Sequence, residues 1–373
     1  MSSHDSRILV IGAGIAGASV AAHLALRNAT TILEMEDRPG YHTTGRSAAV
    51  YEPNYGPRSI LALTRAGRDF YHSPPDGFAG APLTAPRPSL FLMPEGQEEA
   101  ARTFLATAQG IERIGIAEAR ALHPLLRESY PKACYLDTTT SDIDVDLLHQ
   151  GYLRMFKARG GRLVCEARAT AITYRNGGWT VSTPKGEFTA PIIVNAAGAW
   201  ADQVAILAGA QPVGLVPKRR SIAVVPPPAN CNVMSWPLIT DTGETWYCKP
   251  SGGKLLVSPA DATPVDPHDA YAEDETLAVG IERFQQAVDF EVTHVERNWA
   301  GLRTFAPDGE PVCGYDPNCE GFFWLAGQGG YGIQSAPGLS RFAAALIERR
   351  PIPDDIADQG LHESDLLPGR FSA

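Results

Sequence analysis

The sequence predicts an α/β protein of two domains, each assembled from separate segments of the chain. Residues 7–11 form a short apolar run typical of a buried strand, residues 15–27 predict a helix of small residues, and residues 30–34 predict a second strand. This order and length are typical of a parallel β-α-β unit. Pieces of the same kind recur near 146–210 and towards the C-terminus, and β-rich, proline-rich pieces lie between them. A chain of 373 residues suits two domains, or one domain with a large insertion. We expect one domain from 1–50, 145–212 and 298–373, and another from 51–144 and 213–297 whose mixed sheet is mainly antiparallel.

The remaining elements follow from hydrophobic periodicity and from turn residues. An amphipathic helix is expected at 146–158, and a hairpin turn at Asn176-Gly177-Gly178 separates two strands. Helices are also expected at 59–72, 97–109, 117–122, 273–288 and 337–349, strands at 89–93, 162–166, 168–174, 179–183, 187–189, 191–195 and 322–326, and a loop from 351 onwards.

Composition excludes several classes of function. The net charge is −10, and the densest basic spot, Pro-Lys-Arg-Arg at 217–220, is too short for a nucleic-acid surface. No stretch reaches the ~20 apolar residues of a membrane span, so we expect a cytoplasmic protein. The six cysteines are scattered without metal-ligand spacing, which favours reduced thiols and no metal site.

A glycine loop connects the first predicted strand to the first helix. It reads Gly12-Ala-Gly14-Ile-Ala-Gly17. The first glycine permits a tight turn, the second lets backbone approach a pyrophosphate, and the third lets helix and strand pack closely. Glu34 closes the second strand, where a carboxylate accepts hydrogen bonds from ribose hydroxyls and disfavours a 2′-phosphate. The unit therefore predicts a dinucleotide site in which NADP is disfavoured.

Three more segments have ligand-binding character. The segment 41–48 contains Gly45-Arg46-Ser47, which offers backbone donors and a cation, although a solvated loop is the alternative. A buried strand ends in small residues at 194–200, and four glycines lie between 327 and 332 just before a helix. Such a glycine cluster predicts a cradle for an anion or a ring edge.

Arginines in apolar surroundings are candidates for binding a carboxylate. Arg303 lies between apolar residues at the end of a strand, and Arg220 precedes another apolar run. A buried guanidinium is costly unless an anion pairs with it, so a substrate carboxylate or an internal salt bridge is expected. Tyr247 could add a hydroxyl donor.

Together these motifs resemble the superfamily of D-amino acid oxidase, glycine oxidase and sarcosine oxidase. The matching stretches include GAGIAGAS, GYHTTGRSAA, VNAAGAWAD, PKRRS, WAGLR and GQGGYGIQ, and they look most like bacterial D-arginine (D-amino acid) dehydrogenases. The resemblance implies a Rossmann-like FAD domain and a substrate domain. It implies that Arg303, Arg220 and Tyr247 hold a substrate carboxylate, that the Gly330 carbonyl accepts from the amine, and that Tyr55 faces the pocket. The motifs and the resemblance place these residues at the cofactor: Gly12, Gly14, Ile15, Ala16, Gly17, Glu34, Met35, Thr44, Gly45, Arg46, Ser47, Ala48, Ala169, Ala197, Gly198, Trp200, Gly327, Gly329, Gly330, Tyr331, Gly332, Ile333 and Gln334.

The substrate pocket departs from the arginine-specific pattern of that branch. Ser89 stands where an acidic residue would receive a cationic side chain, Val50 stands where a histidine is expected, and Glu52 replaces a small polar residue. Gln334 is the fourth expected pocket residue. Since a guanidinium without a carboxylate partner is costly, a neutral D-amino acid is favoured, although Glu52 offers another route to a cation site.

The flavin is expected to be bound non-covalently. No cysteine follows Arg303 closely, because the nearest is Cys313. Leu255 or Leu256 stands where the sarcosine oxidase branch has an oxygen-activating lysine, which favours a dehydrogenase over an oxidase. The electron acceptor stays open between oxygen, a quinone and a carrier protein.

The expected reaction is FAD-dependent oxidative deamination of a D-amino acid to a 2-oxo acid and ammonia, by hydride transfer from Cα to the flavin N5. Three alternatives remain at this point: oxidation of an N-methyl or cyclic amino acid or a 2-hydroxy acid, a nicotinamide-dependent dehydrogenase, and a non-catalytic FAD-binding protein.

Overall fold

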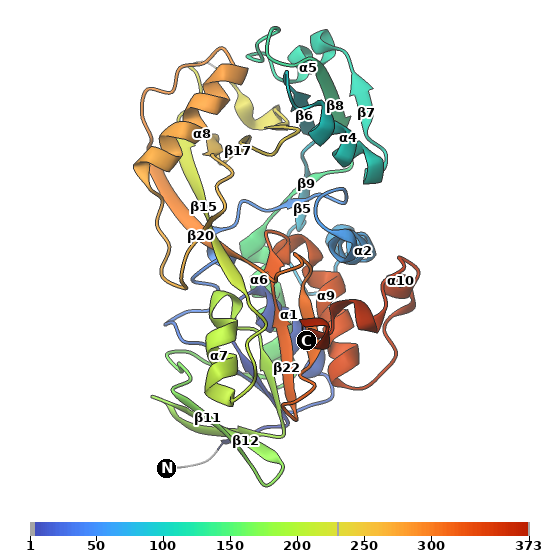
Figure 1. Cartoon of the computed structure of the whole chain (residues 1–373), viewed down its shortest axis with the longest axis vertical. Helices are drawn as coiled ribbons and strands as arrows, with labels where there is room; N and C mark the ends of the chain where they lie inside the picture. The colour runs from blue at the N-terminus through green and yellow to red at the C-terminus, as the bar shows by residue number, and fades with distance from the viewer. Residues whose placement is uncertain (1–3, 230, 372–373) are drawn as a thin grey trace.

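A parallel sheet forms the centre of the lower half of the molecule (Figure 1). The computed structural model describes residues 4–229 and 231–371. The first β-α-β unit pairs β2 with β3 in parallel, and β2 also pairs with β14. Only the edge strand β21 runs antiparallel to its neighbour. In sheet order the strands are β10 (Arg162–Val164), β3 (Thr30–Leu33), β2 (Ile8–Ile11), β14 (Ile192–Asn195), β22 (Phe322–Ala326) and β21 (Val312–Tyr315).

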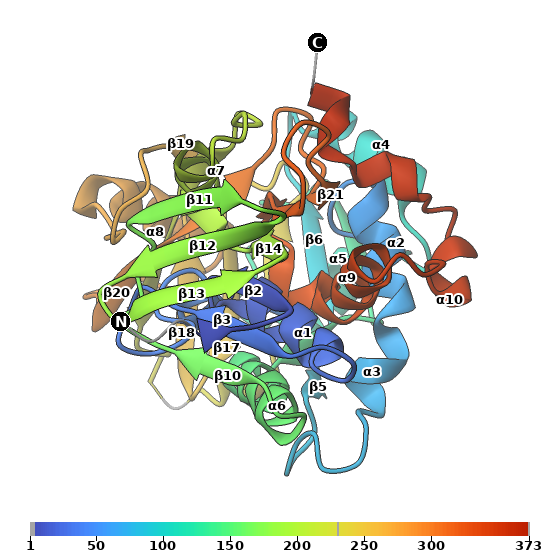
Figure 2. The ribbon, with the colours of Figure 1, turned by 90° about the horizontal axis from the view of Figure 1, so that it is seen from below.

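Both faces of this sheet are buried, which explains its continuous apolar strands. Ile8 and Val10 point into a core that also contains residues of helices α1, α6 and α9, whereas Leu9 and Ile11 point into a second core. The second core is completed by helix α7 and a small sheet, which lies over the central strands in Figure 2. The elements named here are α1 (Ile15–Leu24), α6 (Val145–Ala158), α7 (Ala201–Ala208), α9 (Gly332–Ile347) and the small-sheet strands β1 (His4–Asp5), β13 (Gly186–Ala190), β12 (Gly178–Thr183) and β11 (Ala171–Arg175).

A ten-stranded sheet forms the upper half and reaches down to the parallel sheet through its two long strands, β15 and β20 (Figure 1). All its pairings are antiparallel except the parallel pair β16–β6. Helix α8 packs on one face, where Leu277 and Phe284 join Ala223 and Val257 in a core. The strands in order are β23 (Gln328–Gly329), β20 (Arg297–Phe305), β15 (Val216–Val225), β18 (Lys254–Ser258), β17 (Tyr247–Ser251), β16 (Leu238–Asp241), β6 (Ser89–Met93), β8 (Ala133–Asp137) and β7 (Glu112–Ile114), with β19 (Thr263–Pro264) beside β15 and α8 spanning Asp274–Ala287.

The predicted α/β class with a mixed, mainly antiparallel second sheet is confirmed. The predicted division into two domains stays a prediction. The remaining elements are β4 (Val50–Tyr51), β9 (Ser141–Ile143) and β5 (Thr84–Pro86), which form a three-stranded sheet, and helices α2 (Arg58–Ala66), α3 (Arg68–His72), α4 (Glu98–Thr107), α5 (Ile116–Leu122) and α10 (Asp354–Ala357).

Several predicted helix boundaries are wrong. The first helix ends at Leu24 rather than 27, the helix expected at 59–72 is divided at Gly67, and α7 and α10 were not predicted. The most informative error concerns α9, which begins at Gly332 and not at Pro337. A proline inside a helix leaves the carbonyl four residues earlier without its donor. Here the Tyr71 hydroxyl donates to that carbonyl, Ile333 O, at 2.5 Å, so a tertiary contact allows the helix to start earlier.

Candidate active site

A long cleft runs along the carboxyl ends of the parallel strands, where α/β proteins usually bind ligands. Segments that follow β2, β3, β14 and β22 line one side, and β15, β17 and β20 of the large sheet contribute the other. The cleft has about 1620 Å³ of empty space, including the part open to solvent.

The glycine loop is packed too tightly for any side chain at two of its positions. Gly12 has φ +103°, and a Cβ there would lie 2.5 Å from the Ala196 carbonyl oxygen. A Cβ on Gly17 would lie 1.9 Å from the Gly12 carbonyl oxygen. The loop therefore brings bare backbone and the N-terminus of α1 to the cleft wall, which is an arrangement that accepts a pyrophosphate.

Ala13, the residue between the first two glycines, is hydrogen-bonded through both its amide and its carbonyl. The Ala13 amide donates to Glu34 Oε2 at 2.7 Å, and its carbonyl lies 2.9 Å from His149 Nε2. Because a carbonyl oxygen only accepts, His149 Nε2 donates to it, and burial lowers the pKa of His149. The second Glu34 oxygen accepts from the Glu36 amide at 3.0 Å, and burial raises the pKa of Glu34. Glu34 thus orders the loop while it lines the cleft.

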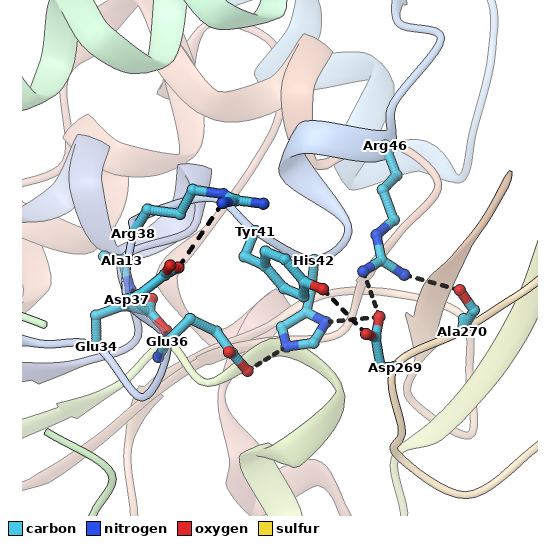
Figure 3. A network of polar contacts seen from close by, with 10 residues as sticks. All are labelled: Ala13, Glu34, Glu36, Asp37, Arg38, Tyr41, His42, Arg46, Asp269 and Ala270. Carbon is cyan, nitrogen blue, oxygen red and sulfur yellow. Dashed lines mark hydrogen bonds and ion pairs between the residues drawn. The ribbon is translucent and has the colours of Figure 1, made fainter. Parts of the chain in front are cut away.

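The Gly-Arg-Ser segment is not a free cation site, contrary to the simplest interpretation of its sequence. The Arg46 guanidinium pairs with Asp269 and donates to the Ala270 carbonyl at 2.9 Å (Figure 3). It also donates to the Ala300 carbonyl at 3.2 Å. Asp269 also accepts from the Tyr41 hydroxyl at 3.0 Å. The Arg46 guanidinium therefore joins the segment 41–46 to residues 269–270 beside the cleft and is not free to bind a ligand anion.

We expect Asp269→Ala to weaken flavin binding modestly. The Asp269 side chain is 59% exposed, and an exposed pair contributes at most about 1 kcal/mol, so the Kd for FAD should rise about threefold. Titration of apoprotein with FAD, followed by fluorescence, measures this. The effect should shrink in 0.5 M NaCl, because salt screens exposed charges. Asp266→Ala is the control, since Asp266 lies in the same exposed segment and has no ion pair within 4–229 and 231–371. Equal effects of both substitutions would contradict a role for the Arg46 pair.

Two arginines meet at the far end of the cleft. Antiparallel pairing of Lys218 with Arg303 and of Arg220 with Gly301 puts both guanidinium-bearing side chains on the same sheet face. Arg220 donates to the Asp261 carbonyl at 2.7 Å, and Arg303 Nη1 lies 3.4 Å from the Tyr55 hydroxyl. Burial and the nearby charge of Arg303 lower the pKa of Arg220.

Neither guanidinium forms a salt bridge with a carboxylate of the described chain. The neighbouring Arg219 differs: it points to the opposite sheet face, where it pairs with Glu273 and Asp261. Two partly desolvated cations that form no salt bridge within the described chain are arranged to hold a carboxylate. Tyr247 on β17 lines the same part of the cleft.

Gly330 and Tyr55 complete the surroundings of Arg303. A Cβ on Gly330 would lie 2.6 Å from Arg303 Nη1, so the absence of a side chain lets the guanidinium lie against the glycine backbone. The Tyr55 ring packs edge-on against Tyr331, with centroids 4.9 Å apart. Gln334 Nε2 donates to the Tyr55 carbonyl at 2.9 Å and to the Glu52 carbonyl at 3.3 Å. Gln334 thus fixes the backbone of the segment 52–55.

The cleft gathers most of the residues expected at the cofactor. Five of them lie outside its walls: Gly17, Gly45, Gly327, Tyr331 and Gln334. Arg303, Arg220, Tyr247 and Gly330 line it, whereas Tyr55, Val50, Glu52 and Ser89 do not. The expected cofactor residues that line it are Gly12, Gly14, Ile15, Ala16, Glu34, Met35, Thr44, Arg46, Ser47, Ala48, Ala169, Ala197, Gly198, Trp200, Gly329, Gly330, Gly332 and Ile333.

Some residues of the site were missed by the sequence reasoning. His42 lines the cleft, packs on Trp200 with ring centroids 4.5 Å apart, and lies 2.8 Å from Glu36. His42 stands inside a motif that was noticed, so its position was a usable signal. His149 and Asp269 carry no such signal, because each acts through a contact far away in sequence.

Metal sites and membrane-spanning helices are both absent from the described part of the chain, residues 4–229 and 231–371. No group of three or more His, Cys, Asp or Glu residues is placed to hold a metal ion. No helix is both long and apolar enough to cross a lipid bilayer.

The fold and the cleft define a dinucleotide-binding oxidoreductase of the flavoprotein class. The closely packed glycine loop, Glu34 and the volume of the cleft fit the pyrophosphate, ribose and ring system of FAD. The family model named DAO, described as FAD dependent oxidoreductase, matches residues 7–346. The chain therefore belongs to the DAO family of FAD-dependent oxidoreductases, and FAD is its cofactor.

Similarity to individual proteins is more distant. The chain is 25% identical to glycine oxidase of Pseudomonas aeruginosa, over 94% of this chain and 97% of that protein. It is 25% identical to mitochondrial sarcosine dehydrogenase of Mus musculus, over 67% of this chain but 29% of that protein. The crystal structure of glycine oxidase from Geobacillus kaustophilus superposes with a TM-score of 0.82 and 21% identity, over 96% of this chain and 99% of the other. That last likeness establishes the fold alone.

Proposed function

We propose that the protein deaminates a D-amino acid oxidatively, giving a 2-oxo acid and ammonia. The observation that carries this proposal is the pair Arg303 and Arg220, which line one end of the cleft without a salt-bridge partner in the described chain. The opposite end of the same cleft fits the dinucleotide. A carboxylate held by the pair would lie beside the expected position of the flavin ring. The D configuration follows from the sequence resemblance alone, and the departure at Ser89 favours a neutral side chain.

The residues of the chain position the substrate, and the cofactor carries the redox chemistry. Arg303 and Arg220 bind the carboxylate, Tyr247 adds a hydroxyl donor, and the Gly330 carbonyl accepts from the amine. When bound, FAD would supply the oxidant, a two-electron acceptor for the hydride that leaves Cα. The amine lone pair stabilises the developing C=N bond, and water then hydrolyses the imino acid to the 2-oxo acid and ammonia. No protein base is needed in this scheme.

We expect kcat/KM to rise with pH to a plateau. The arginines repel an ammonium, and only the neutral amine can form the iminium, so each pH unit below the amine pKa should cost about tenfold. Stopped-flow measurement of flavin reduction from pH 6 to 10 tests this. A second substrate with a lower amine pKa should reach its plateau at a correspondingly lower pH. A plateau at the same pH for both substrates would instead indicate an essential group on the protein.

A second candidate function is oxidation of an N-methyl or cyclic amino acid, or of a 2-hydroxy acid. It is supported by the glycine oxidase and sarcosine dehydrogenase relatives, and the arginine pair would bind those carboxylates equally well. Anaerobic bleaching of the flavin with D- and L-amino acids, sarcosine, proline and 2-hydroxy acids separates the candidates. Turnover of sarcosine or a 2-hydroxy acid without any D-amino acid would overturn our proposal. Readmission of air then shows whether oxygen reoxidises the reduced flavin. If it does not, a quinone or a carrier protein is the electron acceptor to test next.

A further inference from the structure

Three charged side chains form a buried cluster between the large sheet and the segment 47–49. Lys249 of β17 and Arg87, which lies between β5 and β6, are 5% and 6% exposed. Both form ion pairs with Asp142 of β9. Lys249 Nζ lies 2.5 Å from Asp142 Oδ1, and Arg87 Nε lies 2.8 Å from Asp142 Oδ2. Each oxygen of this one carboxylate is therefore paired with a different cation.

The cluster contains more positive than negative charge. Two cations share one carboxylate, and neither has a second carboxylate partner within residues 4–229 and 231–371. Their remaining hydrogen bonds go to neutral carbonyls. Arg87 Nη1 donates to two carbonyls of the segment 234–236, and Lys249 Nζ donates to those of Ala48 and Ala49, both at 3.4 Å. One buried positive charge is thus in excess, and such a charge favours an anion nearby.

Strand register puts Lys249 on the face of the large sheet that lines the cleft. Lys249 lies two residues after Tyr247, a cleft residue, and it pairs with Leu256. Leu256 in turn pairs with Val224, which lies two residues after Ile222, another cleft residue. Paired residues and residues two apart share a face. Lys249 therefore lies on the cleft side of the sheet, although its own side chain is not part of the cleft wall.

Ala48 is the residue that separates the Lys249 ammonium from the cleft. It lines the cleft, packs against Ile222 and Leu256, and accepts from Lys249 Nζ through its carbonyl. Ser47 and Ala48 are the residues of this segment that are expected at the flavin. The excess charge of the cluster is therefore separated from the cofactor cleft by a single residue of the wall.

We propose that the excess positive charge of the cluster Arg87–Asp142–Lys249 raises the reduction potential of the bound flavin. A hydride brings two electrons and one proton, so the flavin ring that accepts it gains one negative charge. A buried positive charge stabilises the reduced ring more than the oxidised ring, because its field is weakly screened away from water. The cluster acts on the cofactor through the wall and does not touch the substrate. The inference requires FAD but no particular substrate.

The test changes the charge of the cluster by one unit at a time. Lys249→Gln lowers the net charge of the cluster from +1, two cations and one carboxylate, to 0. Asp142→Asn raises it by one unit, and the double variant restores the original value. The midpoint potential is measured on the flavin-loaded protein by anaerobic titration against a reference dye, with no amino acid present.

The two single variants are expected to shift the potential in opposite directions. Lys249→Gln should lower the equilibrium constant for flavin reduction about tenfold, which is about 30 mV for a two-electron couple. Asp142→Asn should raise it by a similar factor. The double variant should lie within about threefold of the wild type, because the two changes of charge cancel.

Lys254→Gln is the matched control, because it removes the same charge from the neighbouring strand β18. Lys254 pairs with Glu296, but its side chain is 41% exposed. Solvent and salt screen a charge at that position, so the equilibrium constant should change less than about twofold. Added salt should leave the shift of Lys249→Gln in place, since the cluster is buried.

Opposite shifts distinguish an effect of charge from an effect of structure. A cluster that only held the wall in place would move both potentials in the same direction, because both single variants break the same ion pair. Shifts in the same direction, or a Lys249→Gln potential equal to that of the wild type, would overturn the proposal.

The double variant decides the matter if Asp142→Asn does not retain flavin. Asp142→Asn is expected to be the least stable variant, because it leaves two buried cations without a carboxylate. A double variant with a potential as low as that of Lys249→Gln would overturn the proposal, whereas a potential near that of the wild type supports it. Failure of the proposed deamination has a different signature: no D-amino acid then reduces the flavin, while the potentials still follow the charge of the cluster.

Discussion

Replacing Arg303 by alanine is expected to lower kcat/KM for flavin reduction by about a thousandfold. Two charge-assisted hydrogen bonds to a carboxylate contribute about 1.5–3 kcal/mol each, and about 1.4 kcal/mol corresponds to a factor of ten in rate. Arg303→Lys should recover part of the loss, because an ammonium keeps the charge but not the planar fork. Anaerobic stopped-flow reduction of the flavin measures both variants.

Arg219 provides a control within the same chain. It is adjacent to Arg220 but lies on the opposite sheet face, where Glu273 and Asp261 neutralise it. Arg219→Ala should lower stability, because it leaves Asp261 without this partner, and should keep kcat/KM per bound flavin within about threefold. Added guanidine or a primary amine can test whether the Arg303→Ala cavity is otherwise intact.

The result separates an enzyme from a protein that only binds FAD. If Arg303→Ala is reduced as fast as the wild type, the arginine pair does not hold the substrate. The proposed deamination would then fail together with its alternatives that act on carboxylates. Loss of flavin from the variant would be a separate finding, because Gly330 and Arg303 lie in contact.

The parts of the site that the sequence predicts are those whose cause is local. The glycine loop follows from residues within six positions of each other, and the outcome is a turn that no side chain could occupy. No strand was predicted at Arg219 and Arg220; in the structure β15 places Arg220 at the cleft and Arg219 on the opposite face, against Glu273 just before α8.

The parts that the sequence does not predict depend on contacts between distant segments. From the sequence, Arg46 is expected to be a solvated loop residue. In the structure its guanidinium forms an ion pair with Asp269, which is 223 positions away. The start of α9 depends on the Tyr71 hydroxyl, which donates a hydrogen bond to the Ile333 carbonyl, 262 positions later in the chain. Local propensity fixes the elements, whereas the charge state of the site is set by tertiary contacts.

Gly17→Ala is expected to abolish flavin binding and to destabilise the fold severely. The added Cβ would lie 1.9 Å from the Gly12 carbonyl oxygen and 3.2 Å from Val10 Cγ1. The first of these is a backbone atom that cannot rotate away, so α1 must shift from β2 and from the glycine loop. Overpacking of this kind typically costs about 1–3 kcal/mol and more when backbone must move. Flavin content after purification and urea unfolding measure the two consequences.

A graded series shows whether the close approach itself is responsible. Gly14→Ala meets only the Thr44 side-chain oxygen, at 3.3 Å, and Gly80→Ala meets nothing within 4 Å. We expect flavin retention with weaker binding for Gly14→Ala, and stability within about 1 kcal/mol of the wild type for Gly80→Ala. If Gly17→Ala kept a full complement of flavin, α1 could move without loss of the site. The contact between helix and strand would then not position the backbone that faces the pyrophosphate, and the affinity for FAD would have to come from Glu34 and the segments after β14 and β22 instead.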